Sequence, residues 1–199
     1  GTVVLPGIRR TTSVKKQADD DMSKLERILK DAGINVVYAD AGDCIKSGEF
    51  SVKCMHPCEG YDYESANDYS AVYLVEYGDF SMLMTGDAEK KAEKCIVEDV
   101  NRMAGDAGEP VRLVSVNILK VGHHGSKGAS SEEFLSYVKP ENALISCGAG
   151  NSYGHPHTET LQRLSGIGAK VYRTDESGEI AVRVRDGSYK IEVFKALKG

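Results

Sequence analysis

The sequence lacks the features of membrane-spanning and secreted chains. None of its apolar runs approaches the roughly 18 residues that a helix needs to cross a bilayer. Its N-terminus has neither the basic region nor the apolar region of a signal peptide. We therefore expect a soluble chain. Its 199 residues, 41% of them hydrophobic and 28% charged, fit one globular domain over 1–199.

An excess of positive charge is also missing. The formal net charge is -5 and the isoelectric point is about 5.6. Proteins that bind nucleic acid through their overall charge carry a basic surface, so this composition excludes a general nucleic-acid binder. Any phosphate group that the chain handles has to be held by a few local residues.

The cysteines do not form a recognisable framework. They are odd in number and have no repeating spacing, which argues against a set of disulfides: Cys44, Cys54, Cys58, Cys95 and Cys147. The run Cys54-Met55-His56-Pro57-Cys58 could offer ligands to zinc. A structural zinc needs four ligands, and no second pair stands nearby in the sequence. We expect buried thiols.

Strands and helices alternate along most of the chain, which predicts an α/β fold that closes on an antiparallel hairpin. Helices are expected at 18–32, 88–103, from Ser130 or Ser131 to Pro140, and through Leu161 and Leu164. Strands are expected at 2–5, 34–39, 44–55 (a hairpin), 70–77, 80–84, 111–121, 142–147, 169–173 and 179–194 (a hairpin). The strands at 70–77 and 80–84 are apolar enough to predict a central hairpin buried on both sides.

Two of these strands end in a glycine followed by side chains that bind metals. The strand at 80–84 leads into Thr85-Gly86-Asp87, and the strand that ends at Val121 leads into Gly122-His123-His124-Gly125-Ser126. Carboxylates and imidazoles are ligands of divalent metals, so we predict one site assembled from several strand ends. Adjacent histidines on an extended chain point to opposite sides. One of them could then bind a metal while its neighbour packs or donates to a substrate.

Simpler interpretations of the same residues remain open. Asp87 precedes a predicted helix, where a carboxylate at the N-cap or in the first turn is favoured by the helix dipole. The loop Asn151-Ser152-Tyr153-Gly154-His155-Pro156-His157 concentrates hydrogen-bonding groups that suit an anion, or it is a plain turn.

Taken in order, these stretches resemble a known family. Thr85-Gly86-Asp87, the run Lys120-Val121-Gly122-His123-His124-Gly125-Ser126, the loop 151–157 and Tyr172-Arg173-Thr174-Asp175 are similar to the metallo-β-lactamase-type domain of ComEC competence proteins and their soluble relatives. Asn67-Asp68-Tyr69-Ser70 matches an asparagine-serine signature that stands where many enzymes of this fold keep another histidine. The resemblance extends from about Val3 to Val184.

The resemblance implies an αββα sandwich with two divalent ions, zinc or manganese, at the strand ends. It implies that Asp87 binds or bridges the ions and that one of His123 and His124 is a terminal ligand, with His123 slightly favoured. Asp87 and His124 are the expected catalytic residues. The expected substrate-binding residues are Asn67, Ser70, Ser126, Tyr153 and His155. Two such ions generate hydroxide at neutral pH and neutralise phosphate oxygens during an in-line attack.

The chain also departs from the family. The family's main metal-binding motif, HxHxDH, is absent, and none of the five histidines precedes His56. We expect the C-terminal two-thirds of the domain, with only part of the ligand set. Because a catalytic zinc takes three or more protein ligands, we expect the isolated chain to bind zinc or manganese weakly or not at all and to be inactive. An uncovered sheet edge would favour a homodimer of the fragment.

The resemblance implies that the parent protein degrades one DNA strand during uptake. Its substrate would then be single-stranded DNA or another phosphodiester, and its partner a membrane channel. The present domain would be a soluble, extracytoplasmic part of a bacterial membrane protein. Two alternatives stay open: a hydrolase of this fold that acts on a small ester, lactone or phosphorylcholine, and a structural or binding domain without catalysis.

Overall fold

The computed structural model describes residues 1–7, 15–58, 65, 67–106 and 115–195. The first part of the strand predicted at 111–121 lies outside these residues. So does most of the loop before Asn67.

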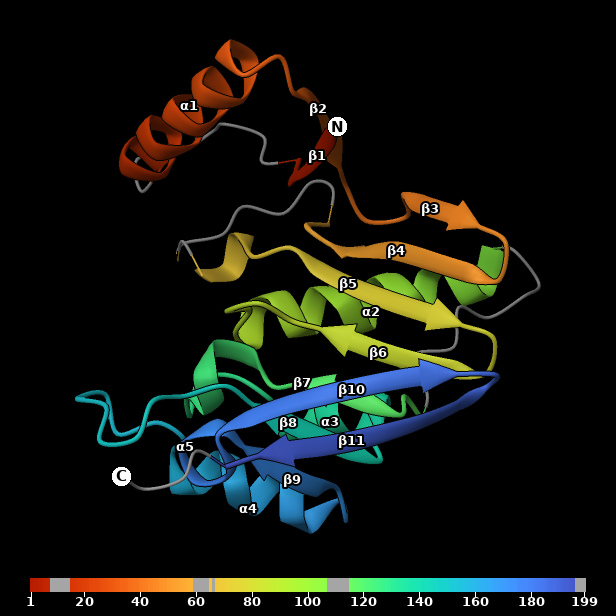
Figure 1. The fold of residues 1–199 in the computed structure, drawn as a ribbon, viewed down its shortest axis with the longest axis vertical. Coiled ribbons are helices and arrows are strands. Elements are labelled where there is room, and N and C mark those ends of the chain that lie inside the picture. Colours follow the sequence, from red (N-terminus) through yellow and green to blue (C-terminus); the bar gives the residue numbers. More distant parts are fainter. Residues whose placement is uncertain (8–14, 59–64, 66, 107–114, 196–199) are drawn as a thin grey trace.

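A mixed seven-stranded sheet forms the centre of the molecule (Figure 1), in the order β3-β4-β5-β6-β7-β8-β9. Its strands are β3 Cys44–Ser47, β4 Phe50–His56, β5 Val72–Tyr77, β6 Phe80–Met84, β7 Ile118–Lys120, β8 Asn142–Ile145 and β9 Lys170–Arg173. Neighbours from β3 to β6 run antiparallel, and neighbours from β6 to β9 run parallel. The carboxyl ends of β6, β7, β8 and β9 therefore lie along one edge of the sheet.

Three helices cover one face of this sheet (Figure 1): α2 Lys90–Asp106, α3 Glu132–Val138 and α4 Thr158–Gly166. The core lies between the two layers, where Leu83 and Leu119 of the sheet belong to the same cluster as Ile96, Phe134 and Leu164 of the helices. Each of these side chains is at most 1% exposed. Full burial of such a side chain stabilises the fold by about 1.5–3 kcal/mol, so this layer contact holds the strand ends in place.

The opposite face carries the closing hairpin, β10 Glu179–Arg185 and β11 Ser188–Phe194, whose turn falls at the predicted Asp186-Gly187. Tyr189 anchors the hairpin to the sheet. Its ring centroid lies 5.4 Å from that of Phe80, and its hydroxyl accepts a hydrogen bond from Asn142 Nδ2 at 2.8 Å. The hairpin crosses in front of the strands in Figure 1.

The prediction that the central hairpin is buried on both sides is wrong. Along β5, Val72 and Leu74 are buried on the helix side, whereas Tyr73 and Val75 on the other side are half-buried. The reason is that the antiparallel strands β3 to β6 have helices on one face only, so side chains on the other face remain partly open to water.

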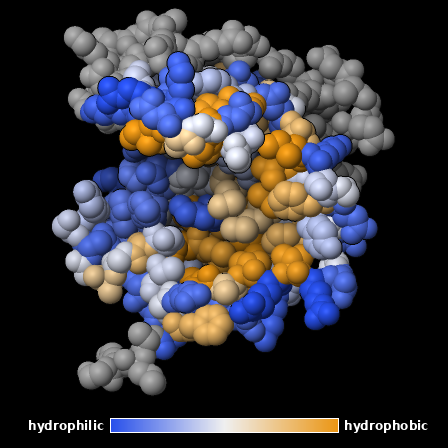
Figure 2. All heavy atoms as spheres, turned by 45° about the horizontal axis from the view of Figure 1, so that its top comes forward, coloured by the Kyte–Doolittle hydropathy of each residue, from blue (hydrophilic) through white to orange (hydrophobic). Residues whose placement is uncertain are grey.

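Apolar side chains follow that open face across several strands. The register pairs Ile45 with Val52, Val52 with Val75 and Val75 with Met82. Ile45 is 55% exposed, and the other three are half-buried. Figure 2 shows apolar side chains gathered in the middle of the molecule, with polar ones on both sides. We call Ile45, Val52, Val75 and Met82 the apolar row.

The remaining elements are a parallel pair, β1 Thr2–Pro6 and β2 Asn35–Ala39, with α1 Lys15–Asp31, the short α5 Thr174–Ser177, and two 3₁₀ turns, η1 Asn67–Tyr69 and η2 Gly122–Gly125. The β1–β2 pair is separate from the seven-stranded sheet.

The expected α/β fold class is confirmed, because helices, sheet and hairpin stack as three layers of a partial αββα arrangement. Over the described ranges, no helix combines the length and apolar character of a membrane span.

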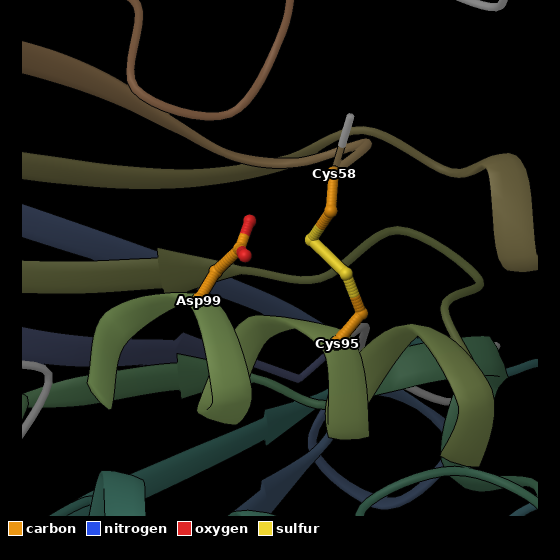
Figure 3. Close-up of side chains that lie close together, drawn as sticks. All are labelled: Cys58, Cys95 and Asp99. Atoms are coloured by element: carbon orange, nitrogen blue, oxygen red, sulfur yellow. A yellow bond between two sulfur atoms is a disulfide. The ribbon is translucent and has the colours of Figure 1, made fainter. Parts of the chain in front are cut away.

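The expectation of five thiols is wrong. Cys58, just after β4, forms a disulfide with Cys95 of α2 (Figure 3). The three free cysteines among the described residues are Cys44, Cys54 and Cys147. The sequence could not reveal this pair because the two cysteines are far apart in the chain and meet only when α2 packs on the sheet. The bond ties the end of β4 to the helix that begins beside the predicted site.

Candidate functional site

The two predicted strand ends are joined directly to each other. The buried hydroxyl of Thr85, after β6, donates a hydrogen bond to the carbonyl of Lys120 at the end of β7, at 2.7 Å. The backbone N–H of His123 donates to the carbonyl of Gly86 at 3.0 Å. These two bonds place the peptide that carries Asp87 beside the turn that carries the histidines.

Glycine is required at two positions of that turn, because the surrounding chain approaches too closely for a side chain. A Cβ at Gly122 would meet the carbonyl oxygen of Ala88 at 2.8 Å. A Cβ at Gly125 would meet Pro156 Cβ at 2.6 Å, and Gly125 also has a positive φ of 83°. The glycines of this motif therefore allow the histidine turn to pack against both neighbouring segments.

The prediction that His123 and His124 point to opposite sides of an extended chain is wrong. β7 ends at Lys120, and both histidines lie in η2 with left-handed backbone angles, φ 43° and 55°. Left-handed conformations are uncommon for residues other than glycine and cluster at functional sites. The turn brings the two ring centroids to 6.3 Å, so both imidazoles lie in one region.

Asp87 and His124 form the most direct contact between the predicted ligands. The Nε2 atom of His124 lies 3.8 Å from Oδ1 of Asp87, and both side chains are nearly half exposed. The other ring nitrogen, Nδ1, lies 2.7 Å from the carbonyl oxygen of Ser146. Since a carbonyl only accepts, Nδ1 donates, and a neutral ring then has its lone pair on Nε2, facing Asp87.

His123 has a different partner. Its Nδ1 lies 2.8 Å from Oε1 of Glu89, and the amide nitrogen of Asn67 lies 3.4 Å from the same ring atom. An ionised carboxylate only accepts, so the ring donates through Nδ1 to Glu89. Glu89 was not among the predicted site residues.

His155 lies at the centre of the imidazole cluster. Its ring centroid is 5.5 Å from that of His123, 6.4 Å from His124 and 4.9 Å from His157. Burial lowers the pKa of His155, positive charge on the three neighbouring histidines lowers it further, and the negative charge of Asp87 opposes them. The predicted loop 151–157 thus brings its histidines to the strand ends, and Asn151 shapes it by accepting from His155 N at 3.0 Å.

The other predicted substrate-binding residues differ in position. The Ser70 hydroxyl accepts a hydrogen bond from Asp87 N at 3.1 Å, so Ser70 lies at the site with Asn67. Tyr153 is 77% exposed and stacks on His155 at 5.8 Å. Ser126 is buried, and its hydroxyl accepts from Gly128 N at 3.3 Å within the turn. Ser126 therefore shapes the backbone beneath the cluster.

A buried histidine forms a hydrogen bond with the backbone of Ser70. His56 is fully buried, and its Nδ1 lies 2.8 Å from the Ser70 carbonyl oxygen. Burial lowers its pKa to about 4, although the hydrogen bond to Ser70 opposes the shift. The ring is therefore neutral at pH 7 and donates through Nδ1.

The chain is similar in sequence to parts of known proteins. No family model matches it. It is 33% identical over 163 residues to ComE operon protein 3 of Bacillus subtilis (strain 168), which is 82% of this chain and 20% of that protein. It is 35% identical over 132 residues to competence protein ComA of Neisseria gonorrhoeae, which is 66% of this chain and 18% of that protein.

The chain is homologous to part of the ComEC competence proteins. It spans about a fifth of the length of these relatives. Among solved structures, the CmlA β-hydroxylase E377D mutant aligns with 70% of this chain and 32% of its own, with 13% identity and a TM-score of 0.44.

The donors of this ComEC homologue fit a divalent ion in kind but not in number. Asp87 and His124 offer a carboxylate oxygen and an imidazole nitrogen 3.8 Å apart, whereas a catalytic zinc takes three protein ligands. In the described part of the chain, one group of three donors lies within 4.8 Å of one another: Cys58, Cys95 and Asp99 (Figure 3). Its two sulfurs are bonded to each other and do not act as thiolate ligands.

The sequence did not predict a role for two residues at the ComEC-like site, Glu89 and His157. Glu89 stands two residues after Asp87, at the start of a helix, where acidic residues are common because of the dipole, so its carboxylate carried no distinguishing signal. His157 was quoted in the loop but given no role. Its Nδ1 accepts a hydrogen bond from Lys127 N at 3.2 Å, which ties the loop to the histidine turn.

Proposed function

We propose that this chain is part of a metal-dependent hydrolase that cleaves phosphodiester bonds, with single-stranded DNA as the substrate of the parent protein during DNA uptake. The observation that supports it most is the contact between Asp87 and His124 at the carboxyl ends of two parallel strands, inside a cluster of further imidazoles. The similarity to the relative named competence protein ComA also supports a role in DNA uptake.

The chain's own residues divide into three roles in this proposal. Asp87 and His124 would hold one side of the metal site through Oδ1 and Nε2. Zinc or manganese ions bound there, two in the complete domain, would supply Lewis-acid charge and a nucleophilic water. Asn67 and His155 lie beside His123, and Ser70 lies beside Asp87; these three residues would contact the phosphate group or the leaving oxygen. Ser70 also fixes the Asp87 peptide.

A phosphodiester polymer is favoured over a small ester or lactone by a basic cleft next to the cluster. The cleft is about 720 Å³ and is lined by Lys90, Lys91, Lys94, Lys127 and Arg163 together with Glu93, Glu132 and Glu133. Glu93 is turned inward, where it accepts from the backbone N–H groups of Ser130 and Ser131. Lysine ammonium groups along a cleft attract the successive phosphates of a single strand.

The cleft joins the cluster at Lys127 and Gly128. Lys127 N donates to His157, and a Cβ at Gly128 would meet Glu89 Oε1 at 2.8 Å. A strand lying in the cleft would therefore lead toward the imidazoles. This is the basis for proposing a polymeric substrate.

The disulfide supports a working location in an oxidising compartment. Disulfides such as Cys58–Cys95 persist outside the cytoplasm and are rare within it. We infer that the domain is the extracytoplasmic part of a bacterial membrane protein, with the channel of that protein as its partner. In the same proposal the residues 1–199 form one partial domain. The isolated chain is inactive because its donors do not complete the metal site.

The apolar row offers the isolated chain a surface for association with a second copy. Ile45 lies on β3, the edge strand of the sheet, and 55% of its surface is open to water. Edge strands with exposed apolar side chains pair with other chains. We propose that two copies of the isolated chain associate through this face.

The experiment is cleavage of labelled single-stranded DNA with manganese, using the full-length parent protein and the same protein with Asp87→Ala. The proposal expects cleavage that depends on metal and on Asp87, and no cleavage by the present chain alone. Cleavage that the Asp87→Ala protein performs equally well would overturn it. So would hydrolysis of small esters or lactones in the absence of any DNA cleavage.

A further inference from the structure

Glu89 is the one carboxylate, besides Asp87, that contacts the histidine pair in the described part of the chain. Its Oε1 lies 2.8 Å from Nδ1 of His123, and the two side chains are 29% and 26% exposed. The ion pair of Lys94 and Glu98 on the same helix is more open, with side chains 65% and 49% exposed. The Glu89–His123 contact therefore belongs to the interior of the cluster.

The backbone around Glu89 holds this carboxylate in place. The N–H of Lys90 donates to the carbonyl of Gly128 at 3.1 Å. The carboxylate lies over Gly128 so closely that a Cβ there would meet Oε1 at 2.8 Å and Cδ at 3.1 Å. Burial raises the pKa of the Asp68 carboxyl and the nearby backbone of Ala92 and Glu89 lowers it, so Asp68 lies against the start of this helix. Glu89 is thus anchored on both sides and is not a freely moving surface chain.

Each histidine of the turn is held by a hydrogen bond from its own Nδ1 atom, but the two acceptors differ. Nδ1 of His124 donates to the backbone carbonyl of Ser146, and Nδ1 of His123 donates to the Glu89 side chain. In both rings the open atom is Nε2. A substitution cannot remove the carbonyl that holds His124, but it can remove the carboxylate that holds His123.

We propose that Glu89 is a positioning residue: it fixes the Nδ1–H tautomer and the orientation of His123, and so leaves the lone pair of His123 on Nε2. Carboxylates that accept from the far nitrogen of a histidine have this effect at metal sites and in catalytic triads. The role in hydrolysis rests on the proposed function, whereas the tautomer itself does not.

The test reads the ring nitrogens directly, in the metal-free 199-residue chain. Histidine is labelled with ¹⁵N, and the five rings are assigned by single substitutions and observed in long-range ¹H–¹⁵N correlation spectra. We expect His123 and His124 both to carry the proton on Nδ1. In Glu89→Ala, His123 shifts to the pattern of an Nε2-protonated or exchanging ring, while His124 is unchanged.

Two further variants separate positioning from damage to the fold. Glu89→Gln keeps a carbonyl oxygen that accepts from Nδ1, so the wild-type pattern of His123 is expected to return. Glu98→Ala removes a glutamate from the exposed side of the same helix and is expected to leave every ring unchanged. A wild-type His123 that carries its proton on Nε2 overturns the proposal, even if Glu89→Ala does not fold. An unchanged His123 in a folded Glu89→Ala chain also overturns it.

The same variants, made in the parent protein, connect the tautomer to the reaction. Loss of a partner of this kind lowers activity about 10–100-fold, so Glu89→Ala is expected to lower kcat by that factor with KM little changed, and Glu89→Gln to recover most of it. If the parent protein shows no hydrolysis but the tautomer changes as expected, the proposed function fails and the positioning role stands. If hydrolysis is normal in Glu89→Ala, the positioning role fails and the proposed function stands.

Discussion

The imidazole of His124 and the carboxylate of Asp87 follow different strands of the sheet, yet Nε2 and Oδ1 are 3.8 Å apart. The contact depends on the parallel pairing of β6 with β7 and on the hydrogen bond from Thr85 to the end of β7. Both side chains remain open to solvent on one side. They can therefore accept a ligand from outside the chain, which a buried ion pair could not do.

Gly125 is expected to be one of the least replaceable residues near the site. Gly125→Ala adds a methyl group 2.6 Å from Pro156 Cβ at a φ of 83°, and should lower the free energy of unfolding by about 2 kcal/mol or more. Gly150→Ala is the matched control, because Gly150 also has a positive φ, 68°, but open space around it. Urea unfolding measures both. Equal losses for the two variants would contradict the close packing of the loop on the turn.

The disulfide is expected to contribute to stability. Replacing both Cys58 and Cys95 by serine should lower the free energy of unfolding by about 2–4 kcal/mol, because the unfolded chain loses its covalent constraint. Cys44→Ser, at an exposed free cysteine, should change it little. Thiol titration of the unreduced, denatured chain should find the three free thiols. Five reactive thiols there, or an unchanged stability in the double variant, would argue against the bond.

Acid should weaken the fold through His56. Its pKa is about 4 in the folded chain and near 6.5 in the unfolded chain, so the unfolded state binds a proton first as the pH falls. Stability should therefore be full above about pH 6.5 and decline between about pH 6.5 and 4, by up to roughly 3 kcal/mol. His56→Asn, which keeps a donor, should flatten this part of the profile while lowering stability at pH 7.5. Unfolding followed from pH 7.5 to 4.5 gives the comparison, and parallel profiles would exclude His56 as the cause.

The basic cleft should bind single strands in a salt-dependent way. Charge reversal at a lysine that lines the cleft, Lys127→Glu, is expected to weaken binding of a fluorescent oligonucleotide severalfold and to reduce the salt dependence. Lys46→Glu on β3, away from the cleft, serves as the control for net charge. Fluorescence anisotropy measures the affinity. Equal weakening by Lys46→Glu would mean that overall charge, and not the cleft, attracts the strand.

Association of the isolated chain should depend on the apolar row. Light scattering is expected to show a dimer, and Ile45→Lys, which places a charge on the edge strand, is expected to give a monomer. A wild-type monomer at concentrations used for structural work would contradict association through this face.

Local patterns predicted much of the fold because they depend on residues close in sequence. The strand Phe80–Met84, the hairpin turn at Asp186-Gly187 and the start of α3 at Ser131 all agree with the structure. Ser131 accepts the capping hydrogen bond from Phe134 N, a short-range contact that the sequence shows directly. The helix predicted at 88–103 begins two residues later, at Lys90, so Asp87 is not in its first turn.

The predictions that were wrong or missing concern features that depend on contacts between segments far apart in the sequence. The left-handed turn of the two histidines stands between glycines on which Ala88 and Pro156 pack closely, and these contacts come from other segments of the chain. The partner of Cys58 is decided by where α2 lies. Glu89 became recognisable only once its carboxylate was found at the ring of His123. Residue type suggested the ligands, but only tertiary packing assigned their partners.

The most direct test of the metal site is a manganese titration of the isotope-labelled 199-residue chain, followed by paramagnetic broadening of its NMR signals. Weakly bound Mn²⁺ should broaden the signals of Gly86, Asp87 and His124 first, and this selectivity should be lost in Asp87→Asn. Broadening that begins elsewhere, or that is identical in Asp87→Asn, would contradict a metal site built on Asp87 and His124.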